Sequence, residues 1–214
     1  MLKVWGRTTS VNVQKVMWTI AELAIPHERI DAGGAYGVVD KPEYATLNPN
    51  RLVPTMQDGD LTLWESAAIV RYLAHKYGAG GFLPGSEADI ARADQWMTWA
   101  DTTLYPDLIG TIFLGLVRTP AATRNNDAIA AAATRAGERL AILDGVLADR
   151  PYILGDALTM ADITSGALMY RYYELPIARP KLPNVEAWAA RLAKRPAYEA
   201  HVMVDYNVLR VAGA

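Results

Sequence analysis

A change in hydrophobic periodicity near residue 78 constrains the fold of this chain more than any other feature of its sequence. Before that point, short β-like runs alternate with helical periods, which is typical of an α/β domain. After it, one helical segment follows another, separated by polar or proline-containing joints. We therefore expect an α/β domain at residues 1–78, a linker at 79–86 and an all-helical domain at 87–214.

The first part predicts a β-α-β-α-β-β-α order of elements. Asp58-Gly59-Asp60 stands between two β-like runs, and Asp-Gly is a strong signal for a tight hairpin turn. Gly78 is placed to end the helix that follows this hairpin. The individual elements that we expect are strand 2–5, helix 13–24, strand 27–30, strands 52–56 and 61–64, and helix 68–76.

The second part opens with a long helix at 90–117, which Pro106 should kink or interrupt because proline has no amide donor. A second long helix should lie antiparallel to it. Thr159-Met160-Ala161-Asp162 then matches a capping box, so a buried helix should begin there, with Asp162 acting in the cap rather than in catalysis. The residues at core spacing that mark the second helix are Ala136, Leu140, Leu143 and Leu147.

Composition excludes several kinds of function. A net charge of −2 leaves no basic field for a phosphate backbone, so we expect no nucleic-acid partner. No apolar run approaches the roughly 18 residues of a membrane span, and the start lacks a secretory signal, so we expect a soluble, cytoplasmic protein without a membrane partner. The three histidines show no ligand spacing, so no metal site is expected.

The chain contains no cysteine. This excludes disulfides, zinc–thiolate sites, CxxC redox chemistry and a cysteine nucleophile. Any thiol chemistry must therefore use a thiol that comes from outside the protein.

Three separated segments should meet at one side of the expected sheet, because each ends a strand or starts a helix there. They are Thr9-Ser10-Val11-Asn12, Leu52-Val53-Pro54 and Glu65-Ser66. Together they are expected to form one pocket.

Val53-Pro54 stands just before a short strand. A cis proline there would turn the chain and leave the Val53 amide and carbonyl facing outward. Those groups can pair with an extended peptide in the way that an added strand does. The alternative is an ordinary proline at the first residue of a strand.

Glu65-Ser66 stands at the N-terminus of a helix. Free amides, the positive end of the helix dipole and the Ser66 hydroxyl attract a carboxylate there, while Glu65 can receive an ammonium group. This combination suits a free amino-acid end, such as the γ-glutamyl group of glutathione. The alternative is that Glu65 or Ser66 is only a helix cap.

Ser10 and Asn12 stand at the start of the first helix, so a hydroxyl, a side-chain amide and backbone amides converge beyond strand 2–5. Such donors favour a thiolate, and lowering a thiol pKa by about two units corresponds to about 2.7 kcal/mol. The protein then supplies a nucleophile without contributing the sulfur. The alternative is that Ser10 or Asn12 only caps the helix, and we expect one of them to do so.

Three motifs resemble the soluble glutathione transferase family, and the resemblance covers essentially the whole chain. Residues 48–54 (NPNRLVP) resemble its NPxGxVP segment, residues 63–73 its ES-x-AI-x-RYL segment, and residues 158–163 its helix-six capping motif. The resemblance implies a thioredoxin-like N-terminal domain, an all-helical C-terminal domain and a homodimer. It also implies that glutathione is the co-substrate, with its site at Thr9, Ser10, Asn12, Val53, Pro54, Glu65 and Ser66.

Within that site, the resemblance implies that Val53 holds the cysteinyl backbone while Glu65 and Ser66 hold the γ-glutamyl end. The residue that faces the sulfur varies within the family. Trp5-Gly6 stands where the tyrosine-type classes have their tyrosine, and the absence of cysteine excludes the omega-like and beta-class mechanisms. The sequence is therefore similar to the serine type, which is theta-like, or to the nu-like arrangement.

Ser10 would contact the sulfur in the serine type. In the nu-like arrangement Asn12 would do so together with a neighbouring hydroxyl, that of Thr9 or Ser10. We lean to Ser10, with Asn12 second.

Two positions depart from the family pattern. Arg51 stands where glycine is usual, and Leu52 where lysine is frequent. Arg51 or Lys41 would be the replacement partner of the glycyl carboxylate, although a solvated surface charge is the expected role of both.

The second substrate, a hydrophobic electrophile, should lie between the domains. An aromatic stripe at helical spacing more often belongs to a core than to a ligand pocket. The candidates for this pocket are therefore chosen by their position alone. They are Trp96, Trp99, Tyr105 and Phe113.

The sequence therefore predicts a glutathione transferase with a role in detoxification, in which the bound thiolate attacks an electrophile. A close variant is a peroxidase or a glutathione-disulfide reductase, which the nu-like reading of Asn12 favours. The competing class is a noncatalytic binding or interaction module on the same fold. Intact Glu65-Ser66 and Val53-Pro54 argue against that class.

Overall fold

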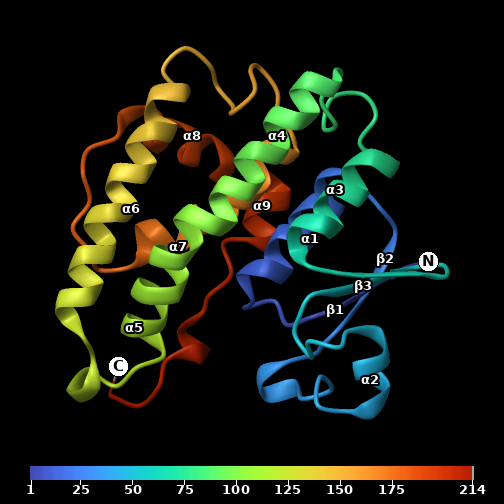
Figure 1. The fold of residues 1–214 in the computed structure, drawn as a ribbon, viewed down its shortest axis with the longest axis horizontal. Coiled ribbons are helices and arrows are strands. Elements are labelled where there is room, and N and C mark those ends of the chain that lie inside the picture. The colour runs from blue at the N-terminus through green and yellow to red at the C-terminus, as the bar shows by residue number, and fades with distance from the viewer. Residues whose placement is uncertain (214) are drawn as a thin grey trace.

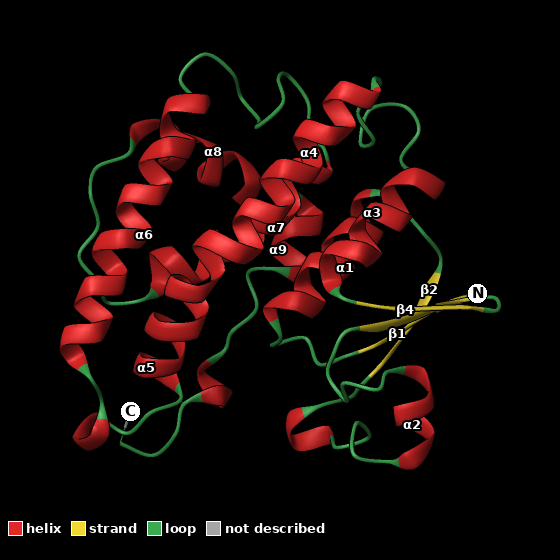
Figure 2. Ribbon diagram, viewed as in Figure 1, coloured by secondary structure: helices red, strands yellow, loops and turns green. Residues whose placement is uncertain are grey.

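A four-stranded mixed sheet forms the centre of the first domain in this computed structural model, which describes residues 1–213. The strands lie in the order β2-β1-β3-β4, with β2 parallel to β1 and the other pairs antiparallel. Figure 2 shows α1 and α3 on one side of the sheet and α2 on the other. The strands are β1 (Leu2–Trp5), β2 (His27–Ile30), β3 (Thr55–Asp58) and β4 (Leu61–Trp64), and the helices are α1 (Val11–Glu22), α2 (Pro42–Leu47) and α3 (Ser66–Tyr77).

The register of the strands brings one end of each of three strands, β1, β3 and β4, to the same edge of the sheet. Trp5 at the end of β1 pairs with Thr55 at the start of β3, and Thr55 pairs with Trp64 at the end of β4. The chain therefore leaves β1, enters β3 and leaves β4 at one edge of the sheet.

The predicted strands, the hairpin and the two longer helices of this domain are confirmed, with β3 running from 55 to 58 instead of 52 to 56. The bounds of α2 were not predicted, because its six residues are too few for a periodic apolar pattern. Pro42 at its first turn supplies the helical φ angle that starts it. The apolar core of this domain comprises Leu2, Val4, Val13, Val16, Met17, Ile20, Ile25, Met56, Ile69 and Leu73.

The second domain opens with one long helical path. It runs through α4 (Glu87–Trp99), two π-helical segments at Ala100–Leu104 and Pro106–Phe113, and α5 (Leu114–Val117). The expectation of a helix at 90–117 is correct, but Pro106 does not interrupt it. Wider turns with hydrogen bonds five residues apart accommodate a residue that has no amide donor.

α6 (Asn126–Val146) returns antiparallel to this path, as expected (Figure 1). It buries Ala136, Leu140 and Leu143 against the helical core. The remaining helices are α7 (Met160–Glu174), α8 (Pro183–Ala193) and α9 (Pro196–His201).

The predicted capping box at the start of α7 is present. The Thr159 hydroxyl accepts from the α7 backbone, and the Asp162 carboxylate accepts from the Thr159 amide at 3.0 Å. Asp162 also accepts from the Ile153 amide and from Trp188 Nε1, each at 3.0 Å. Complete burial raises the pKa of Asp162 to about 6, against the opposing effect of these donors. Because the carboxylate is enclosed, its role is the cap.

The two domains share an apolar interface. α1 packs on α7 and α9, and Trp18 meets Tyr198 edge-on with ring centroids 4.9 Å apart. Arg195 also pairs with Glu22 across the interface at 2.6 Å. These contacts fix α1, and with it the loop after β1, against the helical domain.

No helix within residues 1–213 is both long and apolar enough to cross a membrane.

Candidate functional site

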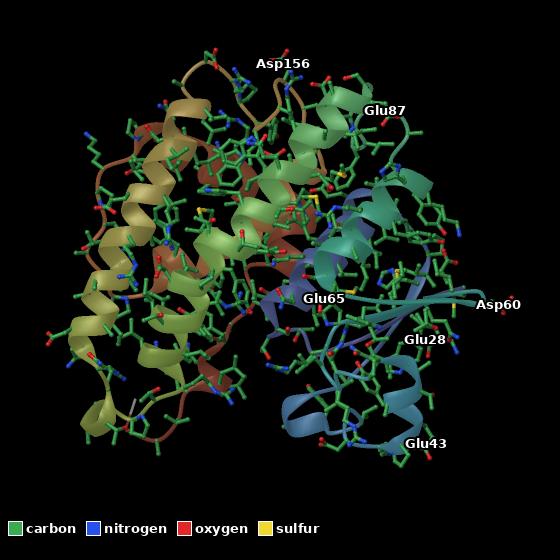
Figure 3. All side chains as sticks on the ribbon, in the orientation of Figure 1. Glu28, Glu43, Asp60, Glu65, Glu87 and Asp156 are labelled. Carbon is green, nitrogen blue, oxygen red and sulfur yellow. The ribbon has the colours of Figure 1, made fainter. Side chains whose placement is uncertain are left out.

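The three predicted segments lie at one edge of the sheet. Residues 9–12 follow β1, Val53-Pro54 precedes β3, and Glu65-Ser66 follows β4. The aligned strand ends bring them to the same side. Figure 3 shows Glu65 on the side that faces the helical domain, whereas Glu43 and Asp60 lie on the outer side.

Ser10 is the N-cap residue of α1, with φ −86° and ψ 120°. Its carbonyl accepts from the Gln14 amide at 2.9 Å, which starts the helix, but its side chain makes no capping hydrogen bond. Ser10 therefore occupies the N-cap position, as expected of Ser10 or Asn12, but its hydroxyl makes no capping hydrogen bond. The Ser10 hydroxyl is instead available to a ligand at the start of the helix.

The loop before α1 is held by its carbonyl groups. Gln14 Nε2 donates to the Thr8 carbonyl at 2.8 Å, and Arg171 Nη2 donates to the Thr9 carbonyl at 2.9 Å. Arg171 Nη1 also donates to Gln14 Oε1 at 2.6 Å. Because the carbonyls of Thr8 and Thr9 are engaged from the helical domain and from α1, the loop has a defined shape.

Arg171 is a buried cation, with 1% of its surface exposed. Its guanidinium lies 5.2 Å from the ring centre of Phe113 and 5.6 Å from that of Tyr206. It forms no ion pair within residues 1–213. Burial lowers the pKa of Arg171 to about 10, so the group stays charged at neutral pH.

Asn12, the second residue of α1, is half-buried and lies beside the hydroxyl of Tyr105. Burial raises the pKa of Tyr105, and the Asn12 side chain opposes this shift. Lys15, on the same face of α1, is 1% exposed and donates to Asp101 Oδ1 at 2.6 Å. Burial lowers the pKa of Lys15, while the charges of Asp101 and Glu65 oppose that shift.

The Val53-Pro54 peptide is cis, as predicted. The preceding Leu52 carbonyl accepts from Tyr44 Oη at 2.7 Å and from Asn48 Nδ2 at 3.0 Å. By contrast, the amide and carbonyl of Val53 have no hydrogen-bond partner in the described part of the chain. Those two groups are free to pair with an extended ligand.

Glu65 precedes α3 with φ 71° and ψ 113°, a conformation that residues other than glycine rarely adopt. Glu65 is the N-cap residue of α3, but its side chain is exposed and makes no capping hydrogen bond. Ser66, the first residue of α3, is 6% exposed. The first amides of α3 are therefore not covered by the Glu65 carboxylate.

The other predicted residues are more scattered. Lys41 and Arg51 are exposed, and the side chain of Arg51 makes a long hydrogen bond of 3.5 Å from Nη1 to the Asp40 carbonyl. Trp96 and Trp99 pack against each other on α4, with ring centres 5.2 Å apart.

Phe113 belongs to the core, 5.2 Å from the ring of Tyr206. Of the four aromatic candidates for a second-substrate pocket, Tyr105 interacts with the side chain of Asn12. No group of three or more His, Asp or Glu residues within 1–213 is arranged to hold a metal ion.

The sequence prediction missed Arg7, Lys15 and Arg171. Lys15 interrupts the apolar stripe of α1, and Arg171 is a basic residue within the buried helix α7. A charged residue in such a position is a usable signal, because buried charges are rare without a partner. The sequence alone does not show which distant residue each one meets.

Known proteins are similar to this chain over almost its full length. Residues 9–76 match the family model described as "Glutathione S-transferase, N-terminal domain", and residues 104–196 match "Glutathione S-transferase, C-terminal domain". Glutathione S-transferase GstB of Escherichia coli K12 is 39% identical over 209 residues, covering 97% of this chain and 100% of that protein. Glutathione S-transferase 3 of Zea mays is 32% identical, covering 94% and 93%.

Among solved structures, the theta class glutathione S-transferase of Xanthomonas axonopodis pv. citri with glutathione bound superimposes with a TM-score of 0.90. It is 46% identical, and the match covers 95% of this chain and 98% of that one. The comparison therefore extends to both domains.

Arg171→Met tests whether the buried guanidinium holds the loop. The Thr9 carbonyl and Gln14 Oε1 would lose their donors, so we expect the free energy of unfolding to fall by about 2 kcal/mol. Backbone amides of residues 8–11 should exchange hydrogen faster in the variant. Arg179→Met is the matched control, because Arg179 donates to the carbonyls of Tyr172 and Leu175 and not to the loop. Unchanged exchange at 8–11 in Arg171→Met would contradict this role.

Proposed function

This chain belongs to the glutathione S-transferase family, and from that premise we propose that the Ser10 hydroxyl activates the thiol of bound glutathione for attack on an electrophile. The chain is a glutathione S-transferase with a thioredoxin-like first domain and a helical second domain. The observation that carries the proposal is that Ser10 occupies the N-cap of α1 without using its hydroxyl as a cap.

The peptide-binding part of the site uses groups that have no hydrogen-bond partner within residues 1–213. The free amide and carbonyl of Val53 pair with the cysteinyl backbone, next to Pro54. The Ser66 hydroxyl and the first amides of α3 bind the γ-glutamyl carboxylate, and Glu65 receives the γ-glutamyl ammonium group. These contacts place the cysteinyl side chain toward the loop of Thr9 and Ser10.

Bound glutathione supplies the thiolate that displaces a leaving group from the electrophile. Ser10 donates a hydrogen bond to this thiolate, which lowers the thiol pKa because the charged form is favoured. Asn12 is the second donor, although its side chain also interacts with the hydroxyl of Tyr105. The buried charge of Arg171 behind the loop further favours an anion at this point.

The hydrophobic electrophile binds between the domains against Tyr105. We place the reaction in the cytoplasm, because glutathione must be in its thiol form and the cytosol keeps thiols reduced.

The homodimer is supported by apolar groups on the outer edge of the sheet. β4 is an edge strand, and Leu61 and Trp64 on it are each 38% exposed. Leu52 is 66% exposed next to the peptide site. An edge strand with exposed apolar side chains is a surface that a second copy of this chain can cover.

Ser10→Ala and Asn12→Ala, titrated by the absorbance of the thiolate of bound glutathione, test the assignment of the donor. We expect Ser10→Ala to raise the thiol pKa by about one to two units, because a hydrogen bond to a charged acceptor is lost. Asn12→Ala should raise it less. A larger shift of the thiol pKa in Asn12→Ala would show that Asn12 is the donor. If the thiol pKa shifted in neither variant, the sulfur would have to bind elsewhere.

Ser86→Ala is the matched control for Ser10→Ala. Ser86 also occupies an N-cap, but its hydroxyl accepts from the Asp89 amide at 3.1 Å. Ser86→Ala should lower the free energy of unfolding by about 1 kcal/mol and leave the thiol pKa unchanged. Ser10→Ala should instead raise the thiol pKa and leave the free energy of unfolding nearly unchanged.

Glu65→Gln tests the γ-glutamyl contact by calorimetric titration with glutathione. We expect the dissociation constant to rise about tenfold, because the ammonium group loses a charged partner. Titration with N-acetylglutathione, which has no such ammonium group, should give nearly equal affinities for wild type and variant. Glu43→Gln on the outer side of the domain is the control. An equal loss with both ligands would contradict the pairing.

Analytical ultracentrifugation of the wild type should give the mass of two chains. Leu61→Asp should shift the protein toward the monomer, because a charge on the edge strand opposes its burial. Ile142→Asp is the control, since Ile142 is 57% exposed on α6, away from the sheet. A monomeric wild type, or an equal shift in both variants, would contradict the proposed interface.

A further inference from the structure

The helical domain contains a cavity between α7, α8 and α9 that the proposed reaction does not use. Its volume is about 300 Å³, and its walls are mainly apolar. None of the residues that line it belongs to the segments 9–12, 52–54 and 65–66 of the predicted glutathione site. Ligand pockets in proteins have volumes of about 300–1,000 Å³, so this cavity has room for a small organic molecule.

The cavity has its shape because small side chains of α8 lie opposite large side chains of α7. Ala189, Ala190 and Ala193 line it from α8, at the spacing that places residues on one face of a helix. Tyr170 and Tyr173 line it from α7, again three residues apart. The short alanine side chains do not reach across to the rings, so space remains between the two helices.

Tyr170 gives the cavity an aromatic wall that carries no cation of the protein. Its half-buried ring meets that of Tyr206 edge-on, with centres 6.3 Å apart. No lysine or arginine within residues 1–213 is stacked on the Tyr170 ring. Arg179 lies 5.9 Å from the ring centre of Tyr173, but it does not line the cavity. The Tyr170 ring is therefore free to interact with a cation of a ligand.

Two carboxylates line the same cavity, and no basic side chain of the described residues does. Glu174 ends α7 and Glu186 lies in the first turn of α8, and both are exposed. Neither forms an ion pair within residues 1–213. Glu186 Oε1 accepts from the Leu182 amide at 3.2 Å, which leaves its second oxygen for a ligand. The charge of the cavity is therefore complementary to a cation.

We propose that this cavity is a second, noncatalytic site that binds a small amphipathic organic cation. The ammonium group of the ligand lies near Glu174, Glu186 and the ring of Tyr170, and its apolar body packs against the alanines of α8. An anionic ligand would be repelled by the two carboxylates, and a neutral one would gain nothing from them. This inference goes beyond the proposed function, because the cavity contributes no residue to the glutathione site.

Three probes with the same apolar body test the charge preference by calorimetric titration of the full chain. They are 4-phenylbutylamine, which is a cation at neutral pH, the neutral 4-phenylbutan-1-ol, and the anion 4-phenylbutyrate. We expect the amine to bind about tenfold more tightly than the alcohol, and the anion to bind more weakly than either. Equal affinities for the amine and the alcohol, or no binding of the amine, would overturn the proposal.

The double variant Glu174→Gln/Glu186→Gln tests the two carboxylates. Glutamine at 186 keeps an acceptor for the Leu182 amide, so the start of α8 is preserved. We expect the dissociation constant of the amine to rise about tenfold and that of the alcohol to change less than twofold. Glu28→Gln/Glu43→Gln removes the same charge on the outer side of the first domain and should leave both constants unchanged (Figure 3). An equal loss of amine affinity in both double variants would contradict the site.

Ala190→Leu tests the location, because a larger side chain would fill the cavity. Ala190 is exposed, and leucine is a good helix former, so the thermal unfolding of the variant should match that of the wild type. We expect neither the amine nor the alcohol to bind. Ala187→Leu is the control, since Ala187 is also exposed on α8 but does not line the cavity. Unchanged amine binding in Ala190→Leu would overturn the proposal.

Two further measurements distinguish other occupants of the cavity. Saturating glutathione should change the amine affinity of the wild type less than twofold, and loss of amine binding would place the amine in the glutathione site. Ala190→Leu should leave the mass in analytical ultracentrifugation unchanged, and a shift toward the monomer would make a second copy of the chain the occupant. Either contrary result would overturn the proposal. Failure of the wild type to bind glutathione would instead contradict the proposed function alone.

Discussion

The hydrogen bonds of Arg171 couple the shape of the site to the packing of the two domains. Arg171 reaches from α7 to the Thr9 carbonyl and to Gln14, so the loop before α1 is defined by a residue more than 150 positions away. α7 is itself positioned by the capping box at Thr159 and Asp162 and by the apolar core around it. A loop that follows a short strand thereby acquires a single conformation, which a site for one sulfur atom requires.

The charges around this loop are predominantly positive and incompletely paired. Lys15 is paired with Asp101, but Arg171 and Arg7 have no carboxylate partner in the described chain. Burying a cation without a partner opposes folding, because the charge loses its hydration. The same arrangement favours a bound anion, since no protein carboxylate neutralises it. We therefore regard the missing counterions as a feature of function, although the hydrogen bonds of Arg171 themselves stabilise the loop.

The sequence predicted the parts of the site that depend on local chain geometry. Val53-Pro54 and Glu65-Ser66 each follow from a proline or a helix start, and the alternating periods predicted the order of strands and helices along the chain. Arg7, Lys15 and Arg171 could not be placed, because their partners are distant in sequence and depend on how two domains meet. The π-helical turns around Pro106 were missed for a related reason: tertiary packing sustains the helix where the local preference would end it.

Ser10 stands at the N-cap of α1, but the side-chain hydrogen bond of an ordinary cap is absent there. α4, α6 and α7 begin with side-chain caps from Ser86, Asn125 and Thr159, whereas α1 and α3 have none. α2, α8 and α9 also have no side-chain cap, but each has a proline in its first turn, which needs no amide partner there. An uncapped start leaves backbone amides without partners and forgoes about 1 kcal/mol of stability. α1 and α3, which have neither a side-chain cap nor a proline in the first turn, begin at the edge of the sheet where the ligand is proposed to bind. Their free amides, like the free groups of Val53, are then satisfied by the ligand instead of the protein, so that binding completes the local structure.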